Sequence, residues 1–443
     1  MKTQIHPNIT AHLKRGAFSL LLIMAACLIP FVLGLQQARA QSCTGPGWLA
    51  GPDMPSTGVR MVGVYFPANH KFYAMGGRSM DGVGNDFTHP FEYNLTSNSW
   101  AIKSATFSDN QVSNMACGVL TDSGTDYIYC VGGSAGGQTT ATARVFRYNP
   151  VTDVIESIAS PWPGDTDGIT LPGGFAVFNN KLYILGGFQI NTAMTDTIWE
   201  FTPGTNIWVQ KCAHLPVPRG YIPTVAYFGF IYTAGGSDWN GTTLVDTNDS
   251  FKYDPVADSI TTIPNIPRAT GETRALKFAD VFRPCAPSIW VMGGGRTPPN
   301  PSNEVDTYCP DTWHTGPPFV TARRNFPADT DGGGFSGTGH IWLAGGYASD
   351  GVTPLRSMEI YCNPVPTPST PPEAATPTPT FTPTAPAALP PCATPTPTAT
   401  ATVTPTATAT VTSTATATST PRVTPTPRLQ PTPRTRPTPP PRP

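Results

Sequence analysis

The sequence has few charged side chains, and basic residues are especially scarce in its long central part. Only 12% of the 443 residues are Asp, Glu, Lys or Arg. Four basic residues fall in 1–40, and five arginines and one glutamate fall in 364–443. The 27 basic and 28 acidic residues of the chain therefore leave 18 and 27 for residues 41–363. That segment has a net charge of −9, whereas phosphate contacts need clustered Lys and Arg. We predict that the protein does not bind nucleic acid.

Metal-binding patterns are also missing from the sequence. No Cys-x-x-Cys pair and no cluster of cysteine with histidine occurs, although structural zinc sites are built from such groups. We expect no metal ion and no cofactor. Of the nine cysteines, Cys27 lies within 1–40 and the other eight form an even set. In an exported chain, an even set favours disulfide bonds.

Residues 1–40 have the features of a secretory signal peptide. Lys14-Arg15 precedes an apolar run over 16–35, and Ala38-Arg39-Ala40 is a small-x-small cleavage pattern. We predict cleavage after Ala40 and an exported, extracellular or cell-surface protein. The alternative is that the run stays as an anchor, because it is about as long as the roughly 20 residues that span a bilayer. Pro30 interrupts the run, which weakens that alternative.

A repeat dominates residues 41–363. Six short β-rich runs each carry an aromatic residue three positions before a Gly-Gly pair, as in Lys71-Phe-Tyr-Ala-Met-Gly-Gly77. The first glycines of the pairs are residues 76, 132, 186, 235, 293 and 345, which gives spacings of 56, 54, 49, 58 and 52. A period of about 50 residues is typical of a β-propeller with one four-stranded blade per repeat. We predict an all-β, six-bladed propeller over 41–363.

Each repeat also carries an aromatic residue on its third strand and a Trp or Ile on its fourth. The third-strand residues are Tyr93, Tyr148, Phe201, Tyr253, Tyr308 and Tyr361, and the fourth-strand residues are Trp100, Ile155, Trp208, Ile260 and Trp313. The sixth repeat lacks its fourth strand, but Trp48-Leu-Ala-Gly-Pro52 matches Trp313-His-Thr-Gly-Pro317. We predict that the N-terminal strand completes the last blade, which removes exposed sheet edges.

This architecture predicts three disulfides. Cys43 precedes the closing strand and Cys362 ends the strand that should pair with it. Cys117 and Cys130 flank a hairpin turn symmetrically, and Cys285 and Cys309 should lie at the same end of the fifth blade. The remaining cysteines, Cys212 and Cys392, either pair with each other or stay free.

The repeats resemble kelch repeats across about residues 46–362. The resemblance rests on the six Gly-Gly pairs, the spaced Tyr or Phe residues and the Trp, with Ile155 and Ile260 standing where the family usually has Trp. It implies a six-bladed propeller. It implies no single activity, because the family includes binding modules and a few enzymes.

Residues 364–443 have a different composition, built from Thr-Pro, Thr-Ala and Val-Thr units with spaced arginines. Almost nothing in the segment can be buried in a core, so we predict a disordered tail that favours an extended form. It is similar to the Thr/Pro stalks of exported surface proteins. Its basic end is a candidate for contact with anionic polymers of the cell envelope.

Basic residues precede several first strands, where loops converge on one mouth of the channel. We predict a ligand site there, formed by Arg60, Asn114, Arg219, Arg274 and Arg323-Arg324. Guanidinium groups suit the carboxylates of a peptide or an acidic sugar, and arginines at this place do that work in kelch domains that recognise acidic peptides. The alternative is that each arginine pairs with a nearby acid and stabilises the blades. Loop residues Arg78, Trp239, Arg296 and Tyr347 are further candidates, since aromatic rings there would stack on sugars.

These features predict a monomeric binding module for an extracellular protein or glycan ligand. One alternative is a sugar-acid-modifying enzyme similar to sialic-acid mutarotase, an exported kelch propeller, with Glu272 beside Arg274 as a base. Another is a purely structural surface protein. Copper chemistry like that of galactose oxidase is not indicated, because the histidines of 41–363 are scattered over turns and outer strands. We assign no catalytic residue.

Overall fold

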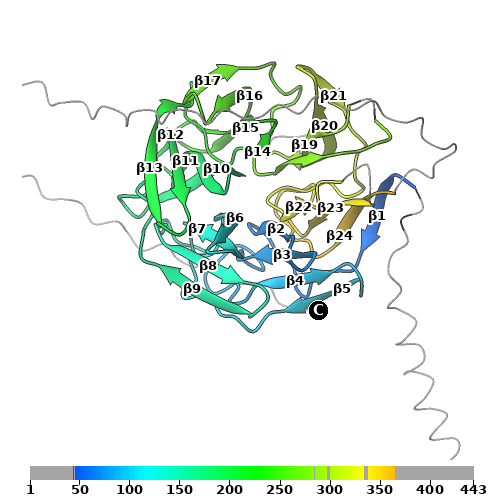
Figure 1. Cartoon of the computed structure of the whole chain (residues 1–443), viewed down its shortest axis with the longest axis horizontal. Coiled ribbons are helices and arrows are strands. Elements are labelled where there is room, and N and C mark those ends of the chain that lie inside the picture. Colours follow the sequence, from blue (N-terminus) through cyan, green and yellow to red (C-terminus); the bar gives the residue numbers. More distant parts are fainter. Residues whose placement is uncertain (1–42, 44, 284, 297–299, 334–337, 365–443) are drawn as a thin grey trace, which may run out of the picture. The chain divides into compact units, whose positions relative to one another are not determined.

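The computed structural model describes residues 43, 45–283, 285–296, 300–333 and 338–364. The predicted signal peptide (1–40) and nearly all of the predicted tail lie outside the described residues, as does Cys392. The described strands form six antiparallel sheets of four strands each around a common centre (Figure 1). Among the described residues, no helix has the length and apolar character needed to span a membrane.

The strands of each blade follow the chain order from the channel outward, except in the last blade. Blade 1 contains β2 (Val62–Phe66), β3 (Lys71–Met75), β4 (Phe91–Asn94) and β5 (Ser99–Ile102). Blade 2 contains β6 (Ala116–Asp122), β7 (Thr125–Val131), β8 (Val145–Asn149) and β9 (Val154–Ile158). Blade 3 contains β10 (Thr170–Phe178), β11 (Lys181–Gln189), β12 (Ala193–Thr202) and β13 (Ile207–His214).

The second half of the chain repeats this plan. Blade 4 contains β14 (Thr224–Tyr227), β15 (Phe230–Trp239), β16 (Leu244–Asp254) and β17 (Ser259–Thr262). Blade 5 contains β18 (Ala275–Phe278), β19 (Ser288–Gly294), β20 (Ser302–Tyr308) and β21 (Trp313–Thr315). Blade 6 contains β22 (Ala328–Thr330), β23 (Gly339–Ala344), β24 (Met358–Asn363) and β1 (Gly47–Gly51). Neighbouring inner strands contact one another all the way round the channel, so the prediction of a six-bladed all-β propeller is confirmed.

The Gly-Gly pairs end the second strands because the backbone there turns in a way that side chains resist. Gly76 has a φ of +61°, and a Cβ at this position would clash with the carbonyl oxygen of Val112 in the next repeat. Only glycine adopts such a conformation without cost. The first glycine of each of the remaining five pairs also has positive φ: Gly132, Gly186, Gly235, Gly293 and Gly345.

In the four blades whose fourth strand has a tryptophan, this residue packs on the third-strand aromatic and ties the blade to the one before it. Trp208, for example, lies 4.9 Å from Phe201 between ring centroids, and its Nε1 donates a hydrogen bond to the carbonyl oxygen of Ser160. Trp48 does the same in blade 6, where it lies 5.3 Å from Tyr361 and donates to the carbonyl oxygen of Pro317. Strand β1 pairs with β24 in the register Trp48–Tyr361, so the N-terminal strand closes the ring as predicted.

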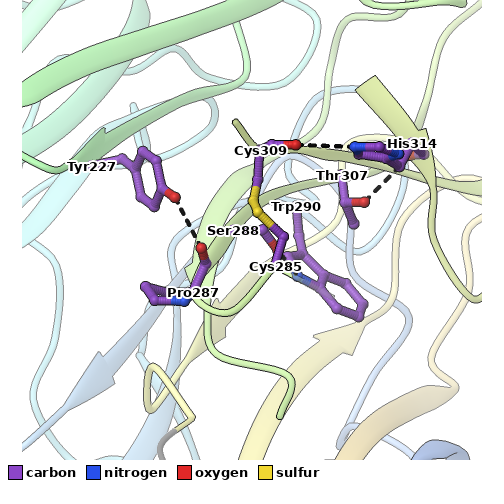
Figure 2. The surroundings of a disulfide bond; sticks show 8 residues. All are labelled: Tyr227, Cys285, Pro287, Ser288, Trp290, Thr307, Cys309 and His314. Atoms are coloured by element: carbon purple, nitrogen blue, oxygen red, sulfur yellow. Dashed lines mark hydrogen bonds between the residues drawn. A yellow bond between two sulfur atoms is a disulfide. The ribbon is translucent and has the colours of Figure 1, made fainter. Parts of the chain in front are cut away.

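The structure joins the six cysteines in the pairs that the sequence analysis proposed. The Cα–Cα distances are 5.7 Å for Cys43–Cys362, 4.2 Å for Cys117–Cys130 and 6.1 Å for Cys285–Cys309. Figure 2 shows the third bond beside Trp290, where the His314 ring is hydrogen-bonded to the carbonyl oxygen of Cys309.

Candidate functional site

One backbone position recurs at the mouth of the channel and places five side chains around it. Just before the inner strands, the residues with left-handed backbone conformation are Arg60, Asn114, Tyr221, Glu272 and Asn325, with φ between 50° and 60°. We call them the mouth ring. Their main chains are linked in series, since the N–H of Asn114 donates to Arg60, Arg60 to Asn325, Asn325 to Glu272 and Glu272 to Tyr221, over 2.6–3.1 Å.

Blade 3 interrupts the mouth ring. Its inner strand β10 begins at Thr170 and pairs with β11 up to Gln189, so the chain is extended at Gly173, where the other blades turn. The hairpin β15–β16 of blade 4 also extends further than its counterparts, with Trp239 paired to Leu244 at its end. These longer strands build a raised side to the mouth.

Three aromatic residues line this raised side, and we call them the aromatic wall: Phe188, Tyr221 and Trp239. The ring centroid of Phe188 lies 5.7 Å from that of Tyr221 and 5.8 Å from that of Trp239. The three rings pack in a small apolar cluster with Leu171 and Leu244, which also line the cavity beside them. Phe188 is buried, whereas Tyr221 and Trp239 are half-buried, so the latter two offer ring surface to a ligand.

A cavity of about 300 Å³ lies between the aromatic wall and three arginines, Arg60, Arg78 and Arg296. Its polar lining also includes Asn114, Gln138 and Asn191. None of the described residues that line this cavity is acidic. The cavity therefore combines hydrogen-bond donors of positive charge with a flat apolar face.

The acidic partners of these arginines stand outside the cavity. Arg60 Nε lies 3.3 Å from Asp81 Oδ1 and 3.2 Å from the Tyr347 hydroxyl. Arg78 Nε donates to Ser113 Oγ at 2.9 Å and lies 3.7 Å from Asp86. A guanidinium has five N–H donors, so one acid behind it leaves donors that can face the cavity. The acids hold the guanidinium groups of Arg60 and Arg78 in position.

Glu272 is held differently from the other members of the mouth ring. Its side chain is fully buried, and it forms ion pairs with Arg296 and Arg324. Burial alone would raise the pKa of Glu272, but the charges of Arg296, Arg324 and Arg60 lower it below the usual range. A carboxylate with a lowered pKa and two guanidinium partners is a poor general base.

The structure brings together only some of the predicted site residues. Arg60 and Asn114 belong to the mouth ring, but Tyr221, not Arg219, occupies the corresponding place in blade 4. Arg219 pairs with Asp249 and lies 3.7 Å from Asp238. Arg323 and Arg324 are buried and paired with Glu359 and Glu272 respectively. For these three arginines, the alternative interpretation of blade-stabilising ion pairs describes the contacts correctly.

From the sequence, Arg78, Trp239 and Arg296 are only further loop candidates, and Phe188, Tyr221 and Asn325 are not predicted as site residues. A signal for two of them was present. Tyr221 and Asn325 stand immediately before the apolar residue that leads into the inner strand, as Arg60 stands before Met61. Aligning the repeats on that apolar residue, not on the basic residues, would have found Tyr221 and Asn325.

Arg274 lies two residues after Glu272 and further into the channel. Its guanidinium carbon is 4.0 Å from the ring centroid of Phe175, which belongs to blade 3. Beyond this stack the channel widens into a cavity of about 560 Å³, lined by the inner strands of all six blades and by Asp329.

Asp329 makes the stability of the protein dependent on pH. Burial raises the pKa of its carboxyl from 3.8 to about 6. A raised pKa means that the folded protein holds this proton more tightly than the unfolded chain. The associated stability is therefore present below about pH 4 and is lost as the pH rises through about 6. We expect D329N to be more stable than the unaltered chain at pH 7.5, by at most about 3 kcal/mol, and to show no gain at pH 4.

Urea unfolding at the two pH values measures this difference. The control is D167N, which alters an exposed aspartate and should leave the pH dependence unchanged. A D329N protein that is less stable than the unaltered chain at pH 7.5 would contradict the assignment.

Comparisons with known proteins agree with the architecture. No family model matches the chain. The chain is similar to Kelch repeat and BTB domain-containing protein 1 of Cowpox virus (strain GRI-90 / Grishak), with 25% identity over 224 residues. It is also similar to Kelch-like protein 35 of Mus musculus, with 28% identity over 141 residues. These alignments span 49% and 31% of this chain, but only 35% and 21% of the two relatives.

A solved structure shares the fold. The structure titled "Structure of YjhT" has a TM-score of 0.53 and 14% sequence identity, and the match covers 69% of this chain and 95% of that chain. At this identity the likeness shows the fold alone. The cavity and its arginines therefore have to be interpreted from their own geometry.

Proposed function

Because this chain is a kelch-repeat β-propeller, we propose that it is a binding module that captures a carboxylate-bearing segment of a protein partner at the channel mouth. The observation that carries the proposal is the cavity of about 300 Å³ lined by Arg60, Arg78 and Arg296 and by no described acidic residue. Preorganised guanidinium groups bind carboxylates through charge-assisted, often bidentate hydrogen bonds. Propellers of this family generally bind protein partners, which favours a peptide segment as the occupant.

An acidic glycan is the second candidate, and the aromatic wall favours it. Tyr221 and Trp239 present partly exposed rings beside the arginines, and such rings have a flat apolar face with a polar edge. A sugar ring stacked on Trp239 would place an attached carboxylate near Arg60 or Arg296. A sugar-acid-modifying enzyme has less support, because Glu272, its candidate base, forms ion pairs with Arg296 and Arg324. These ion pairs make its carboxylate a weaker base.

The proposal includes export of the protein. The predicted signal peptide, the even set of cysteines after Cys27 and the three disulfides of the described residues support an oxidising destination. Under this proposal the Thr/Pro-rich segment is a stalk that displays the propeller or carries it away from the cell surface.

The mouth can be tested with arrays of acidic peptides and acidic glycans and the full-length chain. We expect R60Q and W239A each to weaken binding of the best ligand at least about tenfold, which corresponds to about 1.4 kcal/mol. A lost charge-assisted hydrogen bond or a lost buried aromatic contact has at least this effect. The measurement is the dissociation constant by isothermal titration.

A matched control is R147Q on β8. Arg147 also forms ion pairs, with Asp122 and Glu156, but it does not line the cavity at the mouth, and this variant should bind normally. Selective binding of peptides supports the first candidate, and selective binding of glycans supports the second. If R60Q and W239A bind as tightly as R147Q, the mouth is not the binding site.

A further inference from the structure

Arg274 is the exception among the arginines of the described residues. Eleven of these twelve arginines form an ion pair with Asp or Glu, and Arg274 forms none. Within the described part of the chain it also makes no hydrogen bond, and its Nε is buried without an acceptor. Burial lowers the pKa of the Arg274 guanidinium to about 10, although the charge of Asp329 acts in the opposite direction. Burying a charge is costly, so a guanidinium without an ion pair at the centre of a propeller needs an explanation.

The position of Arg274 suggests that the missing partner comes from outside the chain. Its guanidinium stacks on Phe175 across the channel, and Arg274 lines both the narrow cavity below the mouth ring and the wide cavity at the opposite end. The wide cavity, at about 560 Å³, is the roomier approach, since the narrow one has only about 70 Å³. The side chain is half-buried, so part of its surface is open to whatever enters the channel.

The acids of the wide cavity do not use the donors of Arg274, because they are already bonded to the main chain. Asp329 accepts hydrogen bonds from the N–H groups of Tyr65 and Thr330, at 2.6 and 2.9 Å. Asp331 accepts from the N–H of His340 at 2.8 Å, and its other oxygen lies 2.9 Å from His340 Nδ1. Arg274 therefore has N–H donors that no described residue uses and that an acceptor entering the channel can use.

We propose that the wide end of the channel is a second binding site, in which Arg274 holds a compact oxyanion, a carboxylate or a phosphate. The planar guanidinium matches either group with two parallel hydrogen bonds. The Phe175 ring packs against one face of the guanidinium and holds it in place. This site lies on the face opposite the mouth and does not rest on the proposed function of the mouth.

The charges around the site make anion binding dependent on pH. Arg274 and Lys277 attract an anion, whereas Asp329 and Asp331 repel it; Tyr65 also lines the cavity, and His340 is bonded to Asp331. Asp329, whose pKa is raised to about 6 by burial, becomes neutral as the pH falls through that range. Binding of an oxyanion should therefore tighten between pH 7.5 and pH 5.5.

Isothermal titration of the full-length chain with sodium acetate and with sodium phosphate, at constant ionic strength, tests the site. We expect R274Q to weaken binding of the preferred anion at least about tenfold and R274K to have a smaller effect. The variant D329N should bind the anion several-fold more tightly at pH 7.5 and lose most of the pH dependence of binding. Tighter binding of acetate than of phosphate identifies the oxyanion as a carboxylate, and the reverse order identifies it as a phosphate. The control R147Q should bind these anions normally, because Arg147 lines neither cavity. Binding that R60Q loses belongs to the mouth and binding that R274Q loses belongs to the wide end, so failure at one site is distinguishable from failure at the other.

Two results would overturn the proposal. One is that the unaltered chain binds neither anion at pH 5.5, and the other is that R274Q binds as tightly as the unaltered chain. Should R274Q not fold, crystals of the unaltered chain soaked in sodium arsenate decide the matter. An anomalous peak beside the Arg274 guanidinium supports the site. The absence of this peak in crystals soaked at a saturating arsenate concentration rejects it.

Discussion

Replacing Arg323 by methionine is expected to destabilise the propeller by about 3–5 kcal/mol, the range for a buried ion pair that loses one partner. Arg323 has no exposed side-chain surface. Its Nη1 donates to the carbonyl oxygens of Gly345 and Ser357 at 2.8 and 2.9 Å, and its Nη2 donates to Glu359 at 2.8 Å. Methionine is apolar and has no donors. R323M therefore leaves one carboxylate and three carbonyl oxygens, those of Thr321, Gly345 and Ser357, without this partner.

The free energy of unfolding in urea measures the effect, and R356M is the control. Arg356 also forms an ion pair, with Asp53, but both side chains are about half exposed, and exposed pairs contribute little. We expect R356M to change the free energy by less than about 1 kcal/mol. The double variant R323M/E359Q should recover part of the loss of R323M, because it also removes the buried negative charge. A loss of less than about 1 kcal/mol in R323M would show that Arg323 is dispensable.

The fold could be predicted from the sequence because its determinants are local and repeated. Gly76 and its five equivalents are fixed by a backbone conformation that other residues resist. Each third-strand aromatic has to fill the same space between twisted sheets. Even the closing strand was predictable, since Trp48 makes in blade 6 the contacts that Trp313 makes in blade 5.

The candidate site was less predictable, because it depends on where the repeats differ. Blade 3 has extended backbone at Gly173 and no turn, and because glycine adopts either conformation readily, its presence did not indicate which one to expect. The partners of the arginines are also distant in sequence: Arg324 and Glu272 are 52 residues apart, and Arg60 and Tyr347 are 287 residues apart. The residue types therefore indicated an arginine-rich mouth, but they could not indicate which arginines were already paired.

The disulfide Cys43–Cys362 should contribute more to stability than the hairpin disulfide Cys117–Cys130. It joins residues 319 positions apart, whereas Cys117–Cys130 joins residues 13 positions apart. In the chain-entropy model a disulfide that closes a longer loop restricts the unfolded chain more. The model gives Cys43–Cys362 a stabilisation of about 4–6 kcal/mol, which exceeds that of Cys117–Cys130 by up to about 3 kcal/mol. It also holds β1 on β24, and without β1 the sixth blade would have an exposed sheet edge.

We therefore expect C43S/C362S to lose about 4–6 kcal/mol of unfolding free energy and C117S/C130S to lose about 3 kcal/mol, as the chain-entropy model predicts. Urea unfolding of both variants provides the comparison, and hydrogen exchange of the β1 amides shows whether the closing strand opens first. Faster exchange in β1 than in β2 or β23 would show that the ring opens at this seam. Equal losses in the two variants, with β1 still protected, would mean that the contacts of Trp48 with Tyr361 and with the carbonyl oxygen of Pro317 close the ring without help from the disulfide.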